Sequence, residues 1–301
     1  MKFGVVHISR ILPLILAVYS CSGTADAPTA QVDCTVSIPE ALQTESARVA
    51  FYSNGAFSGS WILQKDIESA GFSGRMNLRM GLYDVVCYNF DIPDTFVKGD
   101  DNISSVCFYT GEPDVRVKRY FALEDSEKVF HTPDKVMFGL KEGLEVKEDN
   151  TGCHIDARPI TESWNIRIKV DGIQYVSSAS ILIDGMRPEC HPCNAELDGK
   201  SSYIWTKLDV GTAISGQFNC FGPAGDRKEH ISLSVLDTQG KPYIFEMDCA
   251  DAMAEARRNG DFTIAPEGSV VVPEPEDTTG TGGGFQPTIG EWNYRSGKII
   301  I

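Results

Sequence analysis

The sequence lacks an apolar stretch long enough to cross a bilayer as a helix. Such a helix needs about 20 consecutive apolar residues, and the longest run here, Ile11–Tyr19, lies near the N-terminus behind Lys2 and Arg10. A short apolar segment after a basic start is typical of a secretory signal. We therefore predict that residues 1–20 are a signal peptide and that the rest of the chain is exported.

Positive charge is also scarce. The 301 residues include 27 Lys and Arg against 42 Asp and Glu, which gives a formal net charge of −15. A surface of this sign repels phosphate backbones, so we expect no nucleic-acid partner. Hydrophobic residues make up 42% of the chain, which is enough to build a sizeable core and indicates a folded protein.

The common catalytic motifs are missing as well. The sequence has no Gly-x-Ser-x-Gly elbow, phosphate-binding loop or His-Glu-x-x-His pair, and no fixed-period repeat of the kind that builds solenoids or propellers. Beyond the leader, each histidine lies in a different segment: His131, His154, His191 and His230. We therefore predict a non-enzymatic protein with no catalytic residues, no cofactor and no metal.

A cysteine follows the apolar run directly. The segment Val18-Tyr19-Ser20-Cys21 resembles the lipobox of bacterial lipoproteins, in which the leader is removed before the cysteine and fatty acyl groups such as palmitate are added to it. The resemblance implies that Cys21 is the lipidation site. Two acyl chains hold a protein stably on a membrane, so we expect a lipid anchor in the outer membrane, facing either the surface or the periplasm. Residues 21–30 are small and aperiodic and would form a tether.

Eight of the nine cysteines remain after Cys21, in a compartment where disulfides persist. Sequence alone cannot choose their pairing. The segment Cys190-His191-Pro192-Cys193 allows three interpretations: structural cysteines, a zinc site, or the reactive pair of a thiol oxidoreductase. A second metal-ligand pair and a βαβ context are both missing, so we favour the structural interpretation. In it, a disulfide between Cys190 and Cys193 closes the loop, or each cysteine is bonded elsewhere.

The exported part of the chain reads as β-structure. Apolar and polar residues alternate in segments such as Val32–Ile38 and Trp164–Val170, which is the period of a half-buried strand. Short strands separated by turn residues predict antiparallel β-sandwiches. We expect an all-β protein with one sandwich over residues 31–158 and another over 159–301, and a helix only at Asp251–Arg258.

We also make predictions for three individual segments. Asn102–Tyr109 is predicted to be a single strand. Pro133 and Gly139 are expected to separate short strands from one another, and the strand pattern is expected to break over Cys153–Pro159.

The C-terminal end differs in composition from the rest. Residues 273–284 are too rich in Gly and Pro to fold alone. The apolar tail that follows, Phe285–Ile301, includes Phe285, Ile289, Trp292 and Ile299. An apolar end on a flexible linker needs a place to be buried, either in its own domain or in a neighbouring molecule.

Three further segments carry a resemblance to a known family. Gly81–Asn89 (Gly-Leu-Tyr-Asp-Val-Val-Cys-Tyr-Asn) resembles a strand of the fimbrillin-like lipoproteins of Bacteroidales. Trp164–Val170 with Ala179–Met186 resembles the start of their second domain, and Gly282–Phe285 with Glu291–Asn293 is similar to their C-terminus. The resemblance implies two tandem transthyretin-like β-sandwich domains and a place among the anchors and minor pilins of type V pili.

The resemblance also implies how such a protein works. Family members assemble on the outer membrane when a strand of one subunit fills a groove in the next, which is a form of β-augmentation. The partners would be other pilin or fimbrial subunits, and the tail with Phe285, Ile289, Trp292 and Ile299 would be the donor strand. Shaft precursors of the family are cut after a basic residue that follows the first strand. Arg48, the basic residue near that position, falls inside a strand pattern, so we expect an uncut anchor, minor pilin or adhesin component.

A different class of function stays open. A surface lipoprotein that binds glycans for polysaccharide uptake would expose aromatic faces for stacking on sugars. That alternative gains weight if several of the four tryptophans, Trp61, Trp164, Trp205 and Trp292, prove to be exposed on one face.

Overall fold

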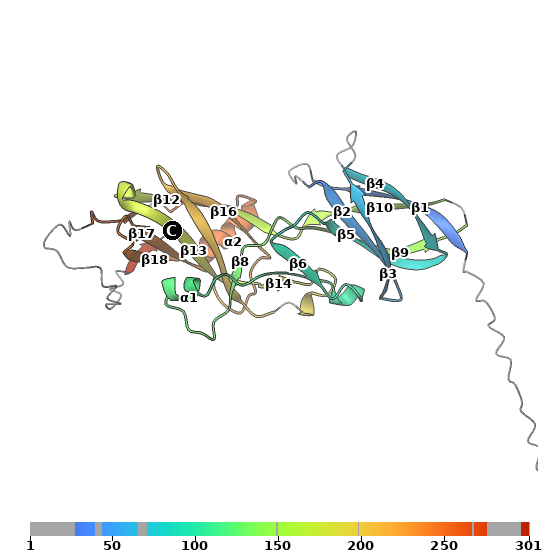
Figure 1. The fold of residues 1–301 in the computed structure, drawn as a ribbon, viewed down its shortest axis with the longest axis horizontal. Coiled ribbons are helices and arrows are strands. Elements are labelled where there is room, and N and C mark those ends of the chain that lie inside the picture. The colour runs from blue at the N-terminus through green and yellow to red at the C-terminus, as the bar shows by residue number, and fades with distance from the viewer. Residues whose placement is uncertain are drawn as a thin grey trace, which may run out of the picture.

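A computed structural model describes residues 28–39, 44–65, 71–148, 150–197, 199–266, 268–275 and 296–300. The described chain is mostly β-structure arranged in sandwich-like layers, and its two halves lie end to end (Figure 1). This confirms the predicted all-β class, while the tandem transthyretin-like arrangement stays a prediction. No helix in these ranges has the length and apolar character needed to span a membrane. Residues 1–20 and Cys21 lie outside the described ranges.

The N-terminal half packs a three-stranded sheet, in the order β10-β1-β4, against a five-stranded sheet, in the order β11-β9-β5-β2-β3. Alternate residues of β1 point into the core, and Val32, Cys34 and Val36 are each at most 2% exposed. The strands are β1 (Thr29–Ser37), β2 (Ser46–Ser53), β3 (Ala56–Gln64), β4 (Gly71–Arg79), β5 (Gly81–Asn89), β9 (Met137–Val146), β10 (Thr151–Asp156) and β11 (Arg158–Pro159).

The C-terminal half is built on a ten-stranded sheet around the fully buried Trp164. Its main path runs β19-β12-β16-β15-β13-β17-β18-β21, with β20 beside β12 and β8 beside β15. The strands are β8 (Val129–His131), β12 (Glu162–Asp171), β13 (Val176–Met186), β15 (Ser202–Val210), β16 (Ile214–Cys220), β17 (His230–Asp237), β18 (Pro242–Asp248), β19 (Thr263–Ile264), β20 (Ser269–Val271) and β21 (Ser296–Ile300).

The helix α2 (Ala250–Asn259) follows β18 and confirms the helix expected at Asp251–Arg258. It ends at Gly260, whose φ of 71° is left-handed and favours glycine. The other helical elements are short: η1 (Ile103–Ser105), α1 (Arg116–Tyr120), η2 (Ile173–Tyr175) and η3 (Ala195–Leu197).

Elements from both halves meet at a junction. A small sheet of β14 (Glu189–Cys190), β7 (Cys107–Thr110) and β6 (Thr95–Lys98) covers an apolar cluster that includes Tyr52, Tyr88 and Phe221. Strand β8 pairs in parallel with β15 of the C-terminal sheet. The domain boundary at residues 158/159 stays a prediction, and these strands pair across it.

Three local expectations differ from the structure. Asn102–Tyr109 is not one strand, because the Asn102 side chain accepts a hydrogen bond from Ser104 N at 3.0 Å and caps the short helix η1. Gly139 lies inside β9 rather than between strands. A Cβ there would come within 2.6 Å of Ile155 and 2.9 Å of the Cys87 sulfur, so only glycine fits the crossing. The segment around Cys153 forms β10, whose pairing with β1 is parallel and far away in sequence.

Candidate functional site

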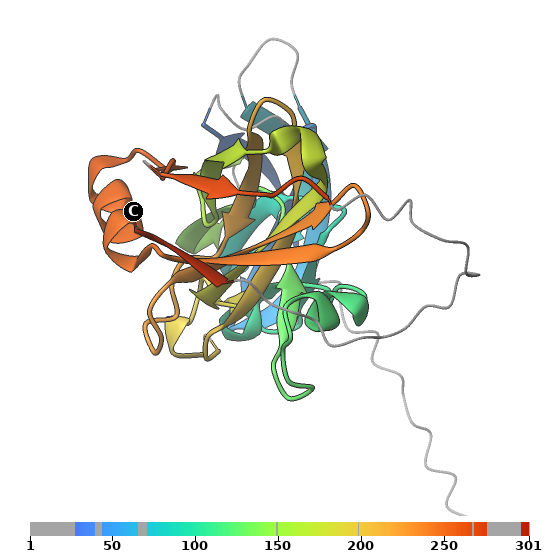
Figure 2. The same cartoon turned by 90° about the vertical axis from the view of Figure 1, so that its left-hand side faces the viewer.

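The last strand of the protein lies at an edge of the ten-stranded sheet. On one side β18 pairs with β17 in an antiparallel hairpin. On its other side β18 pairs in parallel with β21, from Ile244 opposite Ser296 to Asp248 opposite Ile300. Figure 2 shows β21 in dark red beside β18. Within the described residues β21 has a single strand neighbour, so its outer backbone groups form the edge of the sheet.

The sequence places a polar group on β17 and β18 close to this edge. His230 Nε2 lies 2.5 Å from Glu246 Oε2, and the Ser232 hydroxyl donates to the same oxygen at 2.7 Å. The hydrogen bond to Glu246 raises the pKa of His230 above its ordinary value, and the nearby charges of Asp248 and Asp184 act in the same direction. Burial alone would raise the pKa of Glu246, but the hydrogen bonds from His230 and Ser232 lower it. These contacts hold β17 and β18 together where β21 joins them.

The predicted tail residues fall largely outside this description. Phe285, Ile289 and Trp292 lie outside the described residues, and Ile299 is described only as a backbone position opposite Met247. The role of the tail as a donor strand therefore stays a prediction.

The Cys190–Cys193 segment is not built like a thiol oxidoreductase. Cys190 ends the short strand β14 and packs into the junction cluster, and Cys193 lies against the same cluster. The element that follows is the single 3-10 turn η3, so the motif does not open an α-helix. Burial raises the pKa of Cys193 to about 11, whereas a reactive cysteine needs a lowered pKa.

No disulfide joins the eight described cysteines, and the linkage of Cys190 to Cys193 stays a prediction. A pair of neighbouring thiols lies in the N-terminal half, where Cys34 of β1 is directly opposite Cys153 of β10. Contact with Cys153, together with burial, raises the pKa of Cys34.

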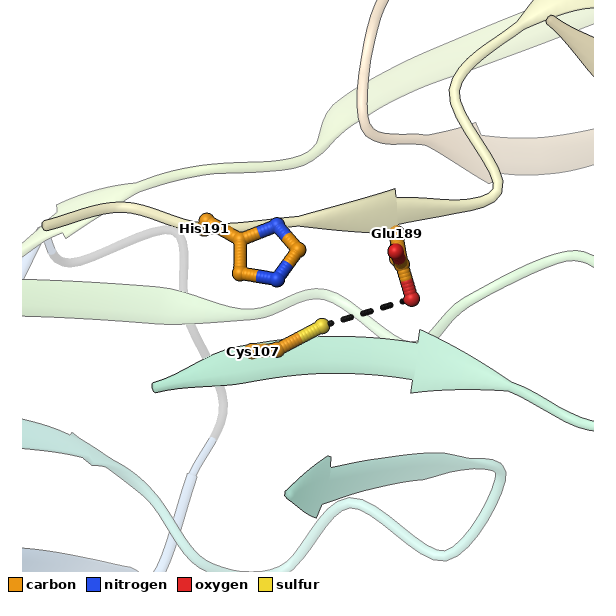
Figure 3. A group of neighbouring side chains, drawn as sticks. All are labelled: Cys107, Glu189 and His191. Atoms are coloured by element: carbon orange, nitrogen blue, oxygen red, sulfur yellow. Dashed lines mark hydrogen bonds between the residues drawn. The ribbon is translucent and has the colours of Figure 1, made fainter. Parts of the chain in front are cut away.

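The other face of the small junction sheet carries three potential metal ligands. Cys107, Glu189 and His191 point toward one another (Figure 3), and one ligand atom of each lies within 4.8 Å of the other two. Sequence analysis singled out His191 but missed Cys107 and Glu189. Cys107 is 82 residues away from Glu189 in sequence, and the register of β7 against β14 that joins them leaves no local pattern.

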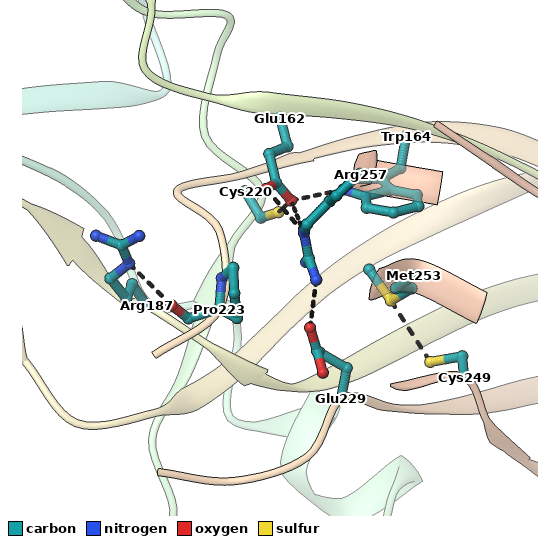
Figure 4. Close-up of polar contacts among 9 residues, drawn as sticks. All are labelled: Glu162, Trp164, Arg187, Cys220, Pro223, Glu229, Cys249, Met253 and Arg257. Carbon is teal, nitrogen blue, oxygen red and sulfur yellow. Dashed lines mark hydrogen bonds and ion pairs between the residues drawn. The ribbon is translucent and has the colours of Figure 1, made fainter. Parts of the chain in front are cut away.

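A half-buried ion cluster fixes α2 to the sheet (Figure 4). Arg257 donates through Nε to Glu162 at 2.8 Å and through Nη1 to Glu229 at 2.5 Å. Its guanidinium lies 5.3 Å from the centre of the Trp164 ring, and the Trp164 indole donates to Glu162 at 3.0 Å. The cluster therefore anchors the segment that immediately follows β18.

The tryptophans give little support to sugar stacking. Trp164 is fully buried, Trp61 and Trp205 are half-buried, and Trp292 lies outside the described residues. The first three also lie in different places: Trp61 beside Phe51 in the N-terminal half, Trp164 in the C-terminal core, and Trp205 beside His131 on β8.

Comparisons with known proteins agree with this fold. A protein from Bacteroides ovatus named "Putative fimbrium anchoring subunit Fim4B" is 22% identical over 144 residues, which are 47% of this chain and 40% of that protein. The chain thus matches less than half the length of that relative.

Solved structures resemble a larger share of the chain. A "putative adhesin" from Bacteroides ovatus superposes with a TM-score of 0.62 at 18% identity, over 83% of this chain and 95% of that one. The fimbrial anchor protein Mfa2 from Porphyromonas gingivalis superposes with a TM-score of 0.51 at 12% identity, over 79% and 90%. A structure from Bacteroides thetaiotaomicron described as "putative polysaccharide binding proteins" superposes with a TM-score of 0.53 at 11% identity, over 79% of this chain and 89% of that one. These likenesses show a shared fold.

The resemblance to fimbrillin-like proteins of Bacteroidales is therefore confirmed. The family model described as "Domain of unknown function (DUF5119)" matches residues 29–204, more than half of the chain. The chain belongs to the DUF5119 family.

Proposed function

We propose that this chain is a non-enzymatic lipoprotein of the outer membrane that serves as a fimbrial anchor, minor pilin or adhesin component. Its fold relatives include a fimbrial anchor and adhesins, which supports a role in a fimbrium or in adhesion at the cell envelope. The observation that carries the proposal is the position of β21, which among the described strands pairs only with β18, at the edge of the C-terminal sheet. An edge of this kind is where a strand of another subunit can be added.

The first strand supports an uncut subunit. β1 lies between β10 and β4 and pairs with both along most of its length. Arg48, the basic residue near the family's cleavage position, lies within β2 between β3 and β5 and forms an ion pair with Asp100 at 3.1 Å. A protease needs an extended, accessible segment, and Arg48 is 21% exposed in a paired strand. This pairing supports an N-terminal half that keeps its own first strand.

The last strand is placed differently. Only five residue pairs, in parallel register, join β21 to β18, and parallel pairing is slightly weaker per residue than antiparallel pairing. The Gly- and Pro-rich sequence before it would let the strand leave β18 and reach another subunit. The vacated edge of β18 would then accept a strand from a neighbour.

An engineered disulfide that holds β21 on β18 tests this proposal. Glu246 and Lys298 are opposite each other in the β18–β21 register, so the double variant Glu246→Cys, Lys298→Cys should form a disulfide on mild oxidation, which mass spectrometry would verify. We expect the locked protein to lose co-purification with fimbrial subunits and to regain it on reduction. The single variant Lys298→Cys is the matched control. Undiminished assembly of the locked protein would refute strand exchange at this edge.

Membrane attachment has its own test. We propose that acyl chains on Cys21 hold the protein in the outer membrane and that residues 21–30 give the body reach. Cys21→Ser should move the protein from the membrane fraction to the soluble fraction, because the acyl chains are its strong anchor. Continued membrane fractionation of the Ser variant would contradict lipid anchoring.

Binding of a surface glycan is the second candidate, favoured by a cavity of about 610 Å³ at the junction that is lined by Tyr109 and Tyr203. Both ring faces already carry cations, however. Lys98 lies 5.0 Å from the centre of the Tyr109 ring, and Arg227 lies 5.9 Å from that of Tyr203. Retention on an immobilised polysaccharide, lost in Tyr109→Ala but kept in the surface variant Tyr120→Ala, would favour the glycan role over assembly.

A further inference from the structure

The register of the junction sheet separates two sets of side chains. Cys190 is opposite Phe108, and both pack into the junction core. Because successive residues of a strand point to opposite faces, their neighbours Cys107 and Glu189 lie on the other face. Strand β6 adds Lys98, which is opposite Cys107. The alternation thus gathers a thiol, a carboxylate and an ammonium group on the face away from the junction core.

His191 completes this group. It directly follows β14 and is 8% exposed, while Cys107 is fully buried and the Glu189 side chain is 25% exposed. The Cys107 thiol lies 3.6 Å from Glu189 Oε2. The sulfur, one carboxylate oxygen and one imidazole nitrogen are all within 4.8 Å of one another. Ligand atoms around a tetrahedral zinc ion are about 3.5 Å apart, a spacing that small side-chain rotations reach from here.

We propose that Cys107, Glu189 and His191 form a binding site for a divalent transition-metal ion, with Zn²⁺ the best match. Zinc takes sulfur, nitrogen and oxygen ligands together, whereas calcium and magnesium prefer oxygen alone. On binding, the Cys107 thiol loses its proton to solvent and the sulfur coordinates the ion. The thiolate and the carboxylate then balance the two positive charges of the ion, and water takes the fourth position.

The surroundings provide an entry path and a counter-ion. Glu189, Lys98 and Tyr109 line the junction cavity of about 610 Å³, from which an ion reaches the carboxylate directly. Lys98 Nζ lies 2.6 Å from Glu189 Oε2, so the ammonium group balances the carboxylate before a metal binds and turns aside afterwards.

The ligands come from segments far apart in the chain. Cys107 lies on β7, which pairs with β6, whereas Glu189 and His191 follow β13 of the C-terminal sheet. An ion bound by all three would crosslink β7 to β14 and to the residue that follows β14. Any ligand that binds only the folded state stabilises it, so zinc should raise the unfolding temperature of the whole chain.

A cobalt titration tests the site directly. The full mature chain, first treated with a chelator, is titrated with Co²⁺ alone, and the near-ultraviolet absorbance of a cobalt–thiolate bond is recorded before Zn²⁺ displaces the cobalt. We expect one ion per chain. Cys107→Ser should remove the thiolate band, and Glu189→Gln and His191→Gln should weaken binding at least about tenfold, since even outer-shell partners of a metal change affinity by that much.

Two control variants distinguish this site from its neighbours. Cys193→Ser alters the other thiol of the Cys-x-x-Cys segment, and Cys249→Ser alters a buried thiol of the C-terminal core. Both should bind cobalt as the parent does. Loss of the band in Cys193→Ser but not in Cys107→Ser, or the absence of saturable binding, would overturn the proposal. Glu189→Gln changes a partly exposed side chain and keeps the test valid if Cys107→Ser fails to fold, which circular dichroism would reveal.

Discussion

The two terminal strands of this protein are held in opposite ways. β1 is the middle strand of its sheet, paired along its length with β4 and over six positions with β10, and its inward side chains are fully buried. In the part of the chain that the structure describes, β21 joins the outside of its sheet through five pairs with β18 alone. A strand in the middle of a sheet cannot leave without breaking two ladders, whereas an edge strand breaks one. The proposed function therefore predicts that β1 stays in its sheet and that β21 exchanges.

The largest expected loss of stability tests whether β1 is held in the core. Val32→Asp places an unpaired charge at a fully buried position of β1, which should cost about 4 kcal/mol or more and unfold the N-terminal half. Urea unfolding followed by tryptophan fluorescence measures the loss. Ser37→Asp, at an exposed position of the same strand, is the control and should change stability by about 0.5 kcal/mol or less. Equal effects of the two variants would show that β1 is not held in the core.

A smaller loss of stability is expected when the ion cluster of Arg257, Glu162 and Glu229 is disrupted. Arg257→Met leaves Glu162 and Glu229 as half-buried carboxylates without their cation, so the free energy of unfolding should fall by about 3 kcal/mol. Arg257→Lys keeps the positive charge but lacks the planar guanidinium that binds two carboxylates, so its free energy of unfolding should fall by less. Chemical denaturation of the three proteins measures this order. If Arg257→Met is as stable as the parent, α2 does not fix the end of β18.

The smallest effect concerns pH at the β17–β18 edge. His230 has a pKa raised above 6.5, so its protonated form stabilises the fold fully below pH 6.5 and the gain is lost as pH rises through the raised pKa. Glu246, with a lowered pKa, adds stability above pH 4.5 that is lost as pH falls through that lowered value. The urea midpoint of the parent should therefore exceed that of His230→Gln, and the difference should be larger at pH 5.5 than at pH 8.5. A difference independent of pH would contradict the ion pair.

Part of this architecture could be predicted from the sequence. Strict alternation over Val32–Ile38 and Trp164–Val170 predicts β1 and β12, because a two-residue period leaves one buried face. The turn residues after Asp237 likewise predict the β17–β18 hairpin, which is observed.

Strand pairing between distant segments and the capping of short helices could not be predicted from the sequence. The parallel contact of β1 with β10 and the approach of Cys107 to Glu189 depend on registers set by the whole sheet. The short helix at Ile103–Ser105 begins at Asn102, whose side chain accepts a hydrogen bond from Ser104 N. A strand-like sequence pattern does not reveal this cap.

Native-state hydrogen exchange of the full chain compares the two terminal strands most directly. Amide protons exchange through local opening where a segment is weakly held and through global unfolding where it is locked in the core. We predict that amides of β1 exchange only with global unfolding and that those of β21 exchange at least about 100-fold faster under native conditions. Protection of β21 equal to that of β1 would contradict an exchangeable C-terminal strand and with it assembly at the β18 edge.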